Sequence, residues 1–203
     1  MFDAKLRPLI DPPLNAIGVR LAKAGVSALT VTFLGLVLGL GAAVAAAFGE
    51  YGLALLLIGA NRLADGLDGA VARASGPTDL GGYFDIVADF AFYVSVPVGF
   101  GLSAEANLVP ALVLVATFVL TGISFLAFAI VAQKRGAETQ AHGKKSFFYS
   151  TGLAEGGETI VAFLAMCLVP AAFPLIAYVF AGLCVATVVQ RSALAVTAFA
   201  EPD

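Results

Sequence analysis

Apolar residues along this chain form long unbroken runs, and most polar residues fall between them. Each run is close to the roughly 20 residues that a helix needs to cross a bilayer. The runs do not alternate between apolar and polar positions, so they do not indicate a transmembrane β-barrel. The pattern predicts an all-α integral membrane protein with six transmembrane helices. We place these spans near residues 28–48, 52–73, 81–102, 107–132, 148–170 and 173–195.

A shorter amphipathic segment precedes the first span, at residues 13–23. Pro13 suits the first turn of a helix, because its fixed φ is helical and its missing N–H would be unbonded there anyway. Leu14, Ile17 and Leu21 fall on one face, whereas Arg20 lies elsewhere. We therefore expect a short helix lying in the membrane interface. The chain divides into an N-terminal segment, 1–27, and a six-helix domain, 28–203.

Composition supports a membrane protein and argues against nucleic-acid binding. Of 203 residues, 60% are hydrophobic and only 12% are charged, and the mean hydropathy is +0.96. A soluble domain of this size does not need so much apolar surface. The net charge is −3, and no basic stripe with interleaved aromatic residues is present. The partners expected from composition are therefore the lipid bilayer and small molecules.

The distribution of basic residues predicts the orientation of the spans. With six spans, nearly all Lys and Arg residues fall on one side, and the turns "GEYG", "SAEAN" and "VPAAFP" on the other side contain none. The positive-inside rule then places both termini in the cytoplasm, as for a protein of a bacterial or archaeal cytoplasmic membrane. Arg62 is the exception, in the middle of span 52–73. We expect it to face the bundle or to snorkel, paired with an acid.

Four aspartates lie within the expected bilayer, although each would cost roughly 2.5–3.5 kcal/mol there on insertion scales. Asp65 and Asp68 are three residues apart, so they share a face of one helix; Asp85 and Asp89, four apart, share a face of the next. The turn "ASGPT" at 74–78 makes the two helices an antiparallel hairpin, which brings both pairs together. The result is a cage of oxygen ligands for one or two divalent cations, Mg²⁺, Mn²⁺ or Ca²⁺.

Small residues flank these acids and leave room beside them. Gly69, Ala72 and Gly81 keep both helices thin, which would admit a bulky group such as a nucleotide, or would allow tight helix packing. Arg73 is a fixed cation that could meet a phosphate or an aspartate, or could simply anchor the cytoplasmic end of the helix. Both interpretations remain open for each of these residues.

The segments "DGLDGAVAR" and "GGYFDIVAD" resemble the signature of the CDP-alcohol phosphatidyltransferases, D-x2-D-G-x2-A-R followed by G-x3-D-x3-D. The resemblance covers all eight fixed positions and extends to the six-helix layout. It implies a transferase that moves a substituted phosphate from a CDP-linked alcohol, usually CDP-diacylglycerol, to a second alcohol while CMP leaves. The fixed positions are Asp65, Asp68, Gly69, Ala72, Arg73, Gly81, Asp85 and Asp89.

The same resemblance implies roles for these positions. Asp65, Asp68 and Asp85 would hold the metals, and Asp89 would be the general base and could also be a metal ligand. The cytidine diphosphate pocket would be shaped by the two acids of the first helix together with the small residues and the arginine. That pocket comprises Asp65, Asp68, Gly69, Ala72, Arg73 and Gly81. Relatives form homodimers, so a homodimer is expected.

The acceptor side is predicted from charges near the last two spans. In relatives that use phosphorylated acceptors, basic residues at this level bind the phosphate, which makes Lys145 and Arg191 candidates. Glu155 and Glu158 would share a face of span 148–170 and either bind acceptor hydroxyls or pair with an arginine. A phosphorylated polyol, glycerol 3-phosphate or inositol phosphate, is the favoured acceptor; serine and a neutral alcohol remain open.

Two other functions would also use intramembrane acids. A prenyltransferase of the UbiA type binds Mg²⁺–diphosphate with aspartates, but it needs a second aspartate motif far along a longer chain. A divalent-cation transporter would explain the carboxylates, although not the small residues or Arg73.

Overall fold

The computed structural model describes residues 2–135 and 152–200, with side chains from residue 10 onward. Every regular element in these residues is helical, as predicted. The helices are α1 (Phe2–Lys23), α2 (Ala28–Ala47), α3 (Tyr51–Ser75), α4 (Asp79–Ser103), α5 (Glu105–Lys134), α6 (Gly156–Leu168) and α7 (Phe173–Phe199), with a 3₁₀ turn, η1 (Pro170–Ala172), before the last.

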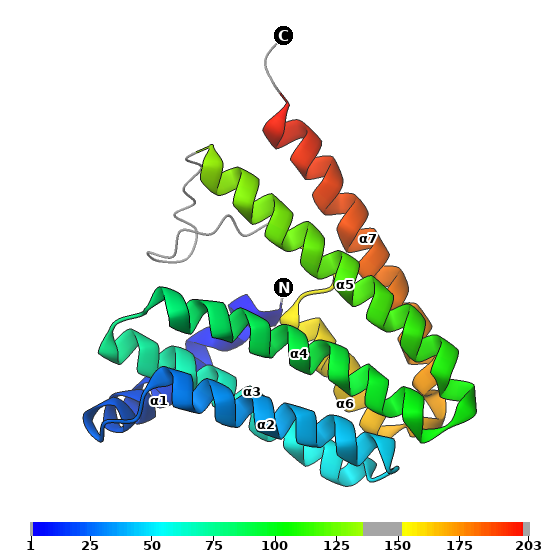
Figure 1. The fold of residues 1–203 in the computed structure, drawn as a ribbon, viewed down its shortest axis with the longest axis horizontal. Helices are drawn as coiled ribbons and strands as arrows, with labels where there is room; N and C mark the ends of the chain where they lie inside the picture. Colours follow the sequence, from blue (N-terminus) through cyan, green and yellow to red (C-terminus); the bar gives the residue numbers. More distant parts are fainter. Residues whose placement is uncertain (1, 136–151, 201–203) are drawn as a thin grey trace.

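Helices α2, α3 and α4 form a layer that α1 and α6 adjoin, whereas α5 and α7 run side by side and lean away from it (Figure 1). Four helices within the described ranges are long and apolar enough to cross a membrane: α2, α4, α5, and the segment 170–199 containing α7. This confirms the character of an integral membrane protein. Helix α6 has only 13 residues, about 20 Å at 1.5 Å per residue.

Two expected helix starts are wrong. The N-terminal helix begins at Phe2 rather than at Pro13, and the chain stays helical through Pro12 and Pro13 although neither residue has a backbone N–H to donate. Within the described part of the span expected over 148–170, residues 152–155 are not helical and α6 begins at Gly156. Glycines at 152, 156 and 157 lower helix propensity there.

Local signals fix the hairpin that carries the aspartates. Helix α3 ends at Gly76, whose φ of +94° lies in the left-handed region that favours glycine. Helix α4 then begins after Thr78, whose hydroxyl accepts a hydrogen bond from the Gly81 N–H at 3.0 Å. The two helices are therefore antiparallel across a three-residue turn, as the breakers Gly76 and Pro77 predicted.

A close approach of α2 and α4 holds the layer together. A Cβ added at Gly99 would lie 2.9 Å from the Ala43 carbonyl carbon, so only glycine allows the two backbones this near. Beyond this contact, aromatic rings fill the centre of the bundle, with Phe100 stacked on Phe173 at 4.9 Å between ring centroids. The acidic face of α3 and α4 lies along this fixed layer.

Candidate active site

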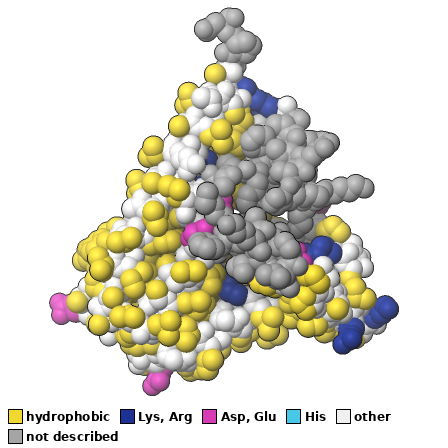
Figure 2. Space-filling view, turned by 180° about the vertical axis from the view of Figure 1, so that it is seen from behind, with side chains coloured by type: hydrophobic (Ala, Val, Ile, Leu, Met, Phe, Trp, Pro, Cys, Tyr) yellow, Lys and Arg dark blue, Asp and Glu magenta, His cyan; other side chains and the backbone are white. Residues whose placement is uncertain are grey.

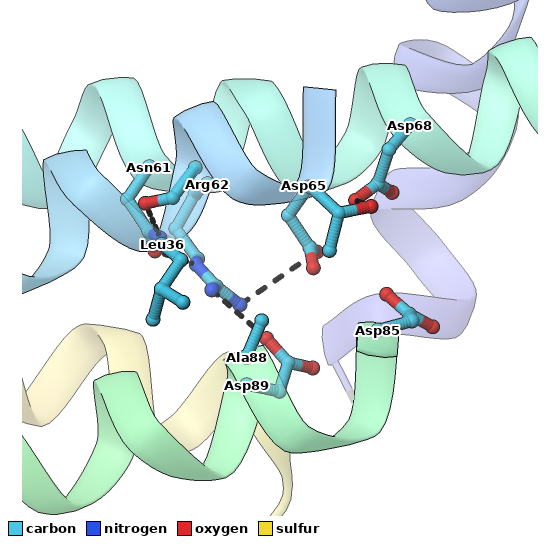
Figure 3. Close-up of a pocket in the computed structure, with 10 residues that line it drawn as sticks. Leu36, Asn61, Arg62, Asp65, Asp68, Asp85, Ala88 and Asp89 are labelled. Atoms are coloured by element: carbon cyan, nitrogen blue, oxygen red, sulfur yellow. Dashed lines mark hydrogen bonds and ion pairs between the residues drawn. The ribbon is translucent and has the colours of Figure 1, made fainter. Parts of the chain in front are cut away.

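Three of the four aspartates converge between α3 and α4. One carboxylate oxygen each from Asp65, Asp68 and Asp85 can be chosen so that all three lie within 4.8 Å of one another. Asp65 and Asp68 descend from α3 toward the residues of α4 (Figure 3). Asp68 is 6% exposed. Three hard oxygen donors at this separation fit a divalent metal ion such as Mg²⁺ or Mn²⁺.

The fourth aspartate is held by an arginine. The Arg62 Nη2 donates a hydrogen bond to Asp89 Oδ1 at 3.0 Å, and its Nη1 lies 3.6 Å from Asp65 Oδ2. Figure 3 shows the guanidinium pointing between these two carboxylates, with the second oxygen of Asp89 turned away from it. The expectation that Arg62 faces the bundle and pairs with an acid is confirmed.

Helix α2 contributes residues that sequence reasoning missed. Thr32 Oγ1 donates to Asp68 Oδ2 at 2.7 Å, and this contact is buried. Asn61 Nδ2 donates to the Gly35 carbonyl of α2 at 2.7 Å. A threonine in an apolar run was the one available signal for Thr32, because its partner depends on how α2 and α3 pack. These contacts tie the acidic site to a third helix.

The proposed nucleotide residues lie at the turn end of the hairpin. Gly69 and Ala72 follow the acids along α3, and Gly81 lies in the first turn of α4. A Cβ added at Gly69 would lie 3.3 Å from Arg73 Nη1, so the arginine side chain runs beside this glycine. Arg73 is exposed and donates from Nε and Nη2 to Asn15 Oδ1, at 3.1 and 2.8 Å. Asn15, on α1, was not foreseen from the sequence.

The acceptor candidates are less closely grouped than expected. Lys145 lies outside the described residues. Glu155 precedes α6 instead of sharing a helical face with Glu158, and its Oε1 accepts a hydrogen bond from the Gly152 N–H at 2.9 Å. Arg191, on α7, is 6% exposed.

Contacts with α5 fix the Arg191 side chain. Its Nη1 donates to the Thr121 carbonyl at 2.9 Å and to Ser124 Oγ at 2.6 Å. It also interacts electrostatically with Glu155. Among the described residues, the pocket around the aspartates is lined by Thr32, Gly35, Leu36, Asn61, Arg62, Asp65, Asp68, Asp85, Ala88 and Asp89. Arg191 and the two glutamates are therefore not part of its lining.

Residues 26–198 of the chain match the family model for CDP-alcohol phosphatidyltransferase. The chain is 44% identical to the inner membrane protein YnjF of Escherichia coli over 192 residues, 94% of this chain and 93% of that one. It is 28% identical to the archaetidylinositol phosphate synthase of Pyrococcus horikoshii over 160 residues, 78% of each chain.

Solved structures share the fold. The phosphatidylinositol phosphate synthase of Mycobacterium tuberculosis with CDP-DAG bound superposes with a TM-score of 0.74 at 21% identity, covering 91% of this chain and 94% of that one. The same enzyme in complex with manganese and citrate gives a TM-score of 0.73, with 93% and 90% coverage. The family match extends over most of the chain and includes the aspartate hairpin. The chain therefore belongs to the CDP-alcohol phosphatidyltransferase family and is an enzyme of that class.

Proposed function

We propose that this enzyme transfers a phosphatidyl group from a CDP-diacylglycerol-type donor to a small alcohol, with release of CMP. The observation that carries the proposal is the convergence of Asp65, Asp68 and Asp85 within 4.8 Å beside Asp89, inside the family's matched region. A solved structure of the same fold with CDP-DAG bound supports the choice of donor.

A divalent metal held by Asp65, Asp68 and Asp85 would neutralise the donor diphosphate and the charge that develops on it. In the proposed reaction, the acceptor hydroxyl oxygen attacks the phosphorus that bears the lipid, and the bond from that phosphorus to the CMP oxygen breaks. Asp89 accepts the hydroxyl proton, for which its carboxylate must come within hydrogen-bond reach of the acceptor. Its second oxygen, turned away from Arg62, would take this role (Figure 3).

The nucleotide would lie along the exposed end of α3 and α4. Gly69, Ala72 and Gly81 leave the backbone of both helices accessible, and Arg73 offers a guanidinium to a phosphate. Because the Arg73 side chain is already fixed by Asn15, less of its conformational freedom is lost on binding. The acidic pocket at one end and this arginine at the other define the ends of a cytidine diphosphate site.

For the acceptor, we infer a phosphorylated polyol, inositol phosphate or glycerol 3-phosphate. The name of the Pyrococcus relative supports inositol phosphate. Arg191 and Lys145 would bind the acceptor phosphate, and Glu155 and Glu158 its hydroxyls. A buried arginine beside a glutamate fits a polar substrate pocket better than a lipid-facing surface.

We further infer six spans, cytoplasmic termini, an interfacial α1 and a homodimer in a prokaryotic cytoplasmic membrane. Hydrophobic side chains are widespread over the described part of the face in Figure 2, most densely at its lower left, which suits contact with lipid. In Figure 2, basic side chains lie at the end where α1 lies, near the top and in the centre of the view, and acidic ones lie in the centre and at the end opposite α1. This asymmetry supports a cytoplasmic location of the α1 end and of the hairpin turn.

The test is CMP release by purified protein supplied with CDP-diacylglycerol, Mn²⁺ and one acceptor at a time. We expect release with inositol phosphate or glycerol 3-phosphate and little with serine or free inositol. Asp89→Asn should abolish release while retaining nucleotide binding, whereas Asp79→Asn, an exposed acid in the first turn of α4, should behave as wild type. Absence of CMP with every acceptor would refute the transferase.

A further inference from the structure

Arg62 is the charged side chain of the acidic pocket that the proposed chemistry does not use. It lies in the middle of α3, with 19% of its side chain exposed, and lines the same pocket as the four aspartates. Burying a guanidinium is costly unless its donors find partners. Its position therefore needs a reason beyond anchoring at the membrane surface.

The guanidinium is fixed from several sides. Besides its ion pairs, Nε donates to Asn61 Oδ1 at 2.7 Å and Nη1 lies 3.4 Å from the Tyr93 hydroxyl. The Phe92 ring lies beneath it, with the carbon Cζ of Arg62 4.5 Å from the ring centroid. Asn61 is itself held by the Gly35 carbonyl. Three helices thus hold one cation at one place.

That place is the side of the acidic cluster occupied by Asp65 and Asp89. The triad within 4.8 Å consists of Asp65, Asp68 and Asp85, and Asp89 is not a member of it. Asp89 instead accepts a hydrogen bond from Arg62 at 3.0 Å, and Asp65 is shared, since it belongs to the triad and lies 3.6 Å from the same guanidinium.

We propose that Arg62 is a built-in cation of the site, which competes with a divalent ion for Asp65 and Asp89. One ion then binds tightly at the triad, and a cation on the Asp89 side must displace the guanidinium. Arg62 acts through the acids and is a positioning residue. The inference rests on the metal site proposed above and adds to it how many ions bind tightly, and why.

The sign of the effect separates this role from a merely structural one. If Arg62 only supports the fold, its loss loosens the pocket and weakens metal binding. If it competes with metal, a neutral side chain removes a positive charge a few ångströms from the ligands, and binding tightens. We expect Arg62→Met to bind Mn²⁺ at least about tenfold more tightly than wild type, or to bind one more ion per chain.

The experiment is a Mn²⁺ titration of detergent-purified protein without donor, followed by electron paramagnetic resonance of the free ion. Arg62→Lys keeps the charge and should resemble wild type. Arg20→Met removes an exposed arginine of α1 and should also leave the titration unchanged. If Arg62→Met does not fold, Arg62→Gln carries the same expectation, because its amide can still donate to Asp89.

Unchanged or weaker Mn²⁺ binding in the folded neutral variants, with wild-type binding intact, would overturn the role of Arg62 alone. A wild-type protein that releases CMP but binds no Mn²⁺ would instead overturn the metal site on which the inference rests. The two failures are distinguishable because the titration needs no turnover.

Discussion

Thr32 offers a direct test of how the acidic site is supported. Its hydroxyl donates to Asp68 Oδ2 at 2.7 Å and also lies 3.0 Å from the Ala28 carbonyl of its own helix. Thr32 and Asp68 are 7% and 6% exposed, so water does not readily replace the lost donor. Thr32→Val keeps the shape of the side chain and removes its contacts with Asp68 and with the Ala28 carbonyl.

A hydrogen bond to a charged group contributes about 1.5–3 kcal/mol, which corresponds to roughly 10- to 150-fold in a binding constant. Substitutions that remove the partner of a metal ligand typically cost about 10–100-fold in metal affinity. We therefore expect Thr32→Val to raise the dissociation constant for Mn²⁺ by about 10–100-fold. The CMP-release rate at low Mn²⁺ should fall with it and should recover at high Mn²⁺.

The matched control is Thr117→Val. Thr117 is equally buried, at 8% exposed, and donates to the Leu114 carbonyl of its own helix, where it borders α7 away from the aspartates. This variant should leave the Mn²⁺ titration unchanged. If both variants shift the titration equally, or if Thr32→Val binds Mn²⁺ as wild type does, the supporting role of Thr32 is wrong.

Two further predictions concern packing and the nucleotide end of the site. Gly99→Ala should destabilise the protein by about 1–3 kcal/mol or more, because its Cβ would meet the Ala43 backbone. The control is Gly59→Ala, whose new Cβ meets nothing within 4 Å; this variant should melt at or above the wild-type temperature in detergent. Equal melting temperatures would contradict the close approach of α2 and α4. Asn15→Ala should raise KM for the CDP-linked donor about fivefold and change kcat less, because about 1 kcal/mol of hydrogen bonding to Arg73 is lost. A fall confined to kcat would speak against a role of Asn15 in positioning Arg73 for the donor.

The convergence of the acids was predictable because it depends on local rules. Spacings of three and four residues put each pair on one helical face, and Gly76 with Pro77 closes the hairpin between them. These rules act over one or two turns, so they predict the face that each pair of acids shares. That Asp65, Asp68 and Asp85 come within 4.8 Å while Asp89 lies outside this triad also depends on how α2 packs against both helices.

Partners across helices were not predictable in the same way. That Arg62 pairs with Asp89, and that Thr32 reaches Asp68, depends on the rotation of α3 against its neighbours. That rotation is set by contacts such as Gly35 beside Ala64, which no local pattern encodes. The late start of α6 has a similar cause. Apolar residues alone indicated a longer helix, but the Gly152 N–H donates to the Glu155 side chain and the Ala154 N–H donates to the Thr187 hydroxyl. These hydrogen bonds hold the residues before α6 in a non-helical conformation.

Helix α3 shows why charge content alone misjudges a span of this kind. It has 25 residues, about 37 Å of helix, yet its charged residues keep it apart from the four plainly apolar helices. Asp68 faces inward, at 6% exposed, while Leu53, Leu56 and Leu63 are at least half exposed. A helix with apolar residues outside and acids inside is inverted relative to a soluble bundle. This inversion supports placing α3 in the bilayer, with its acids facing Arg62 and the site rather than lipid.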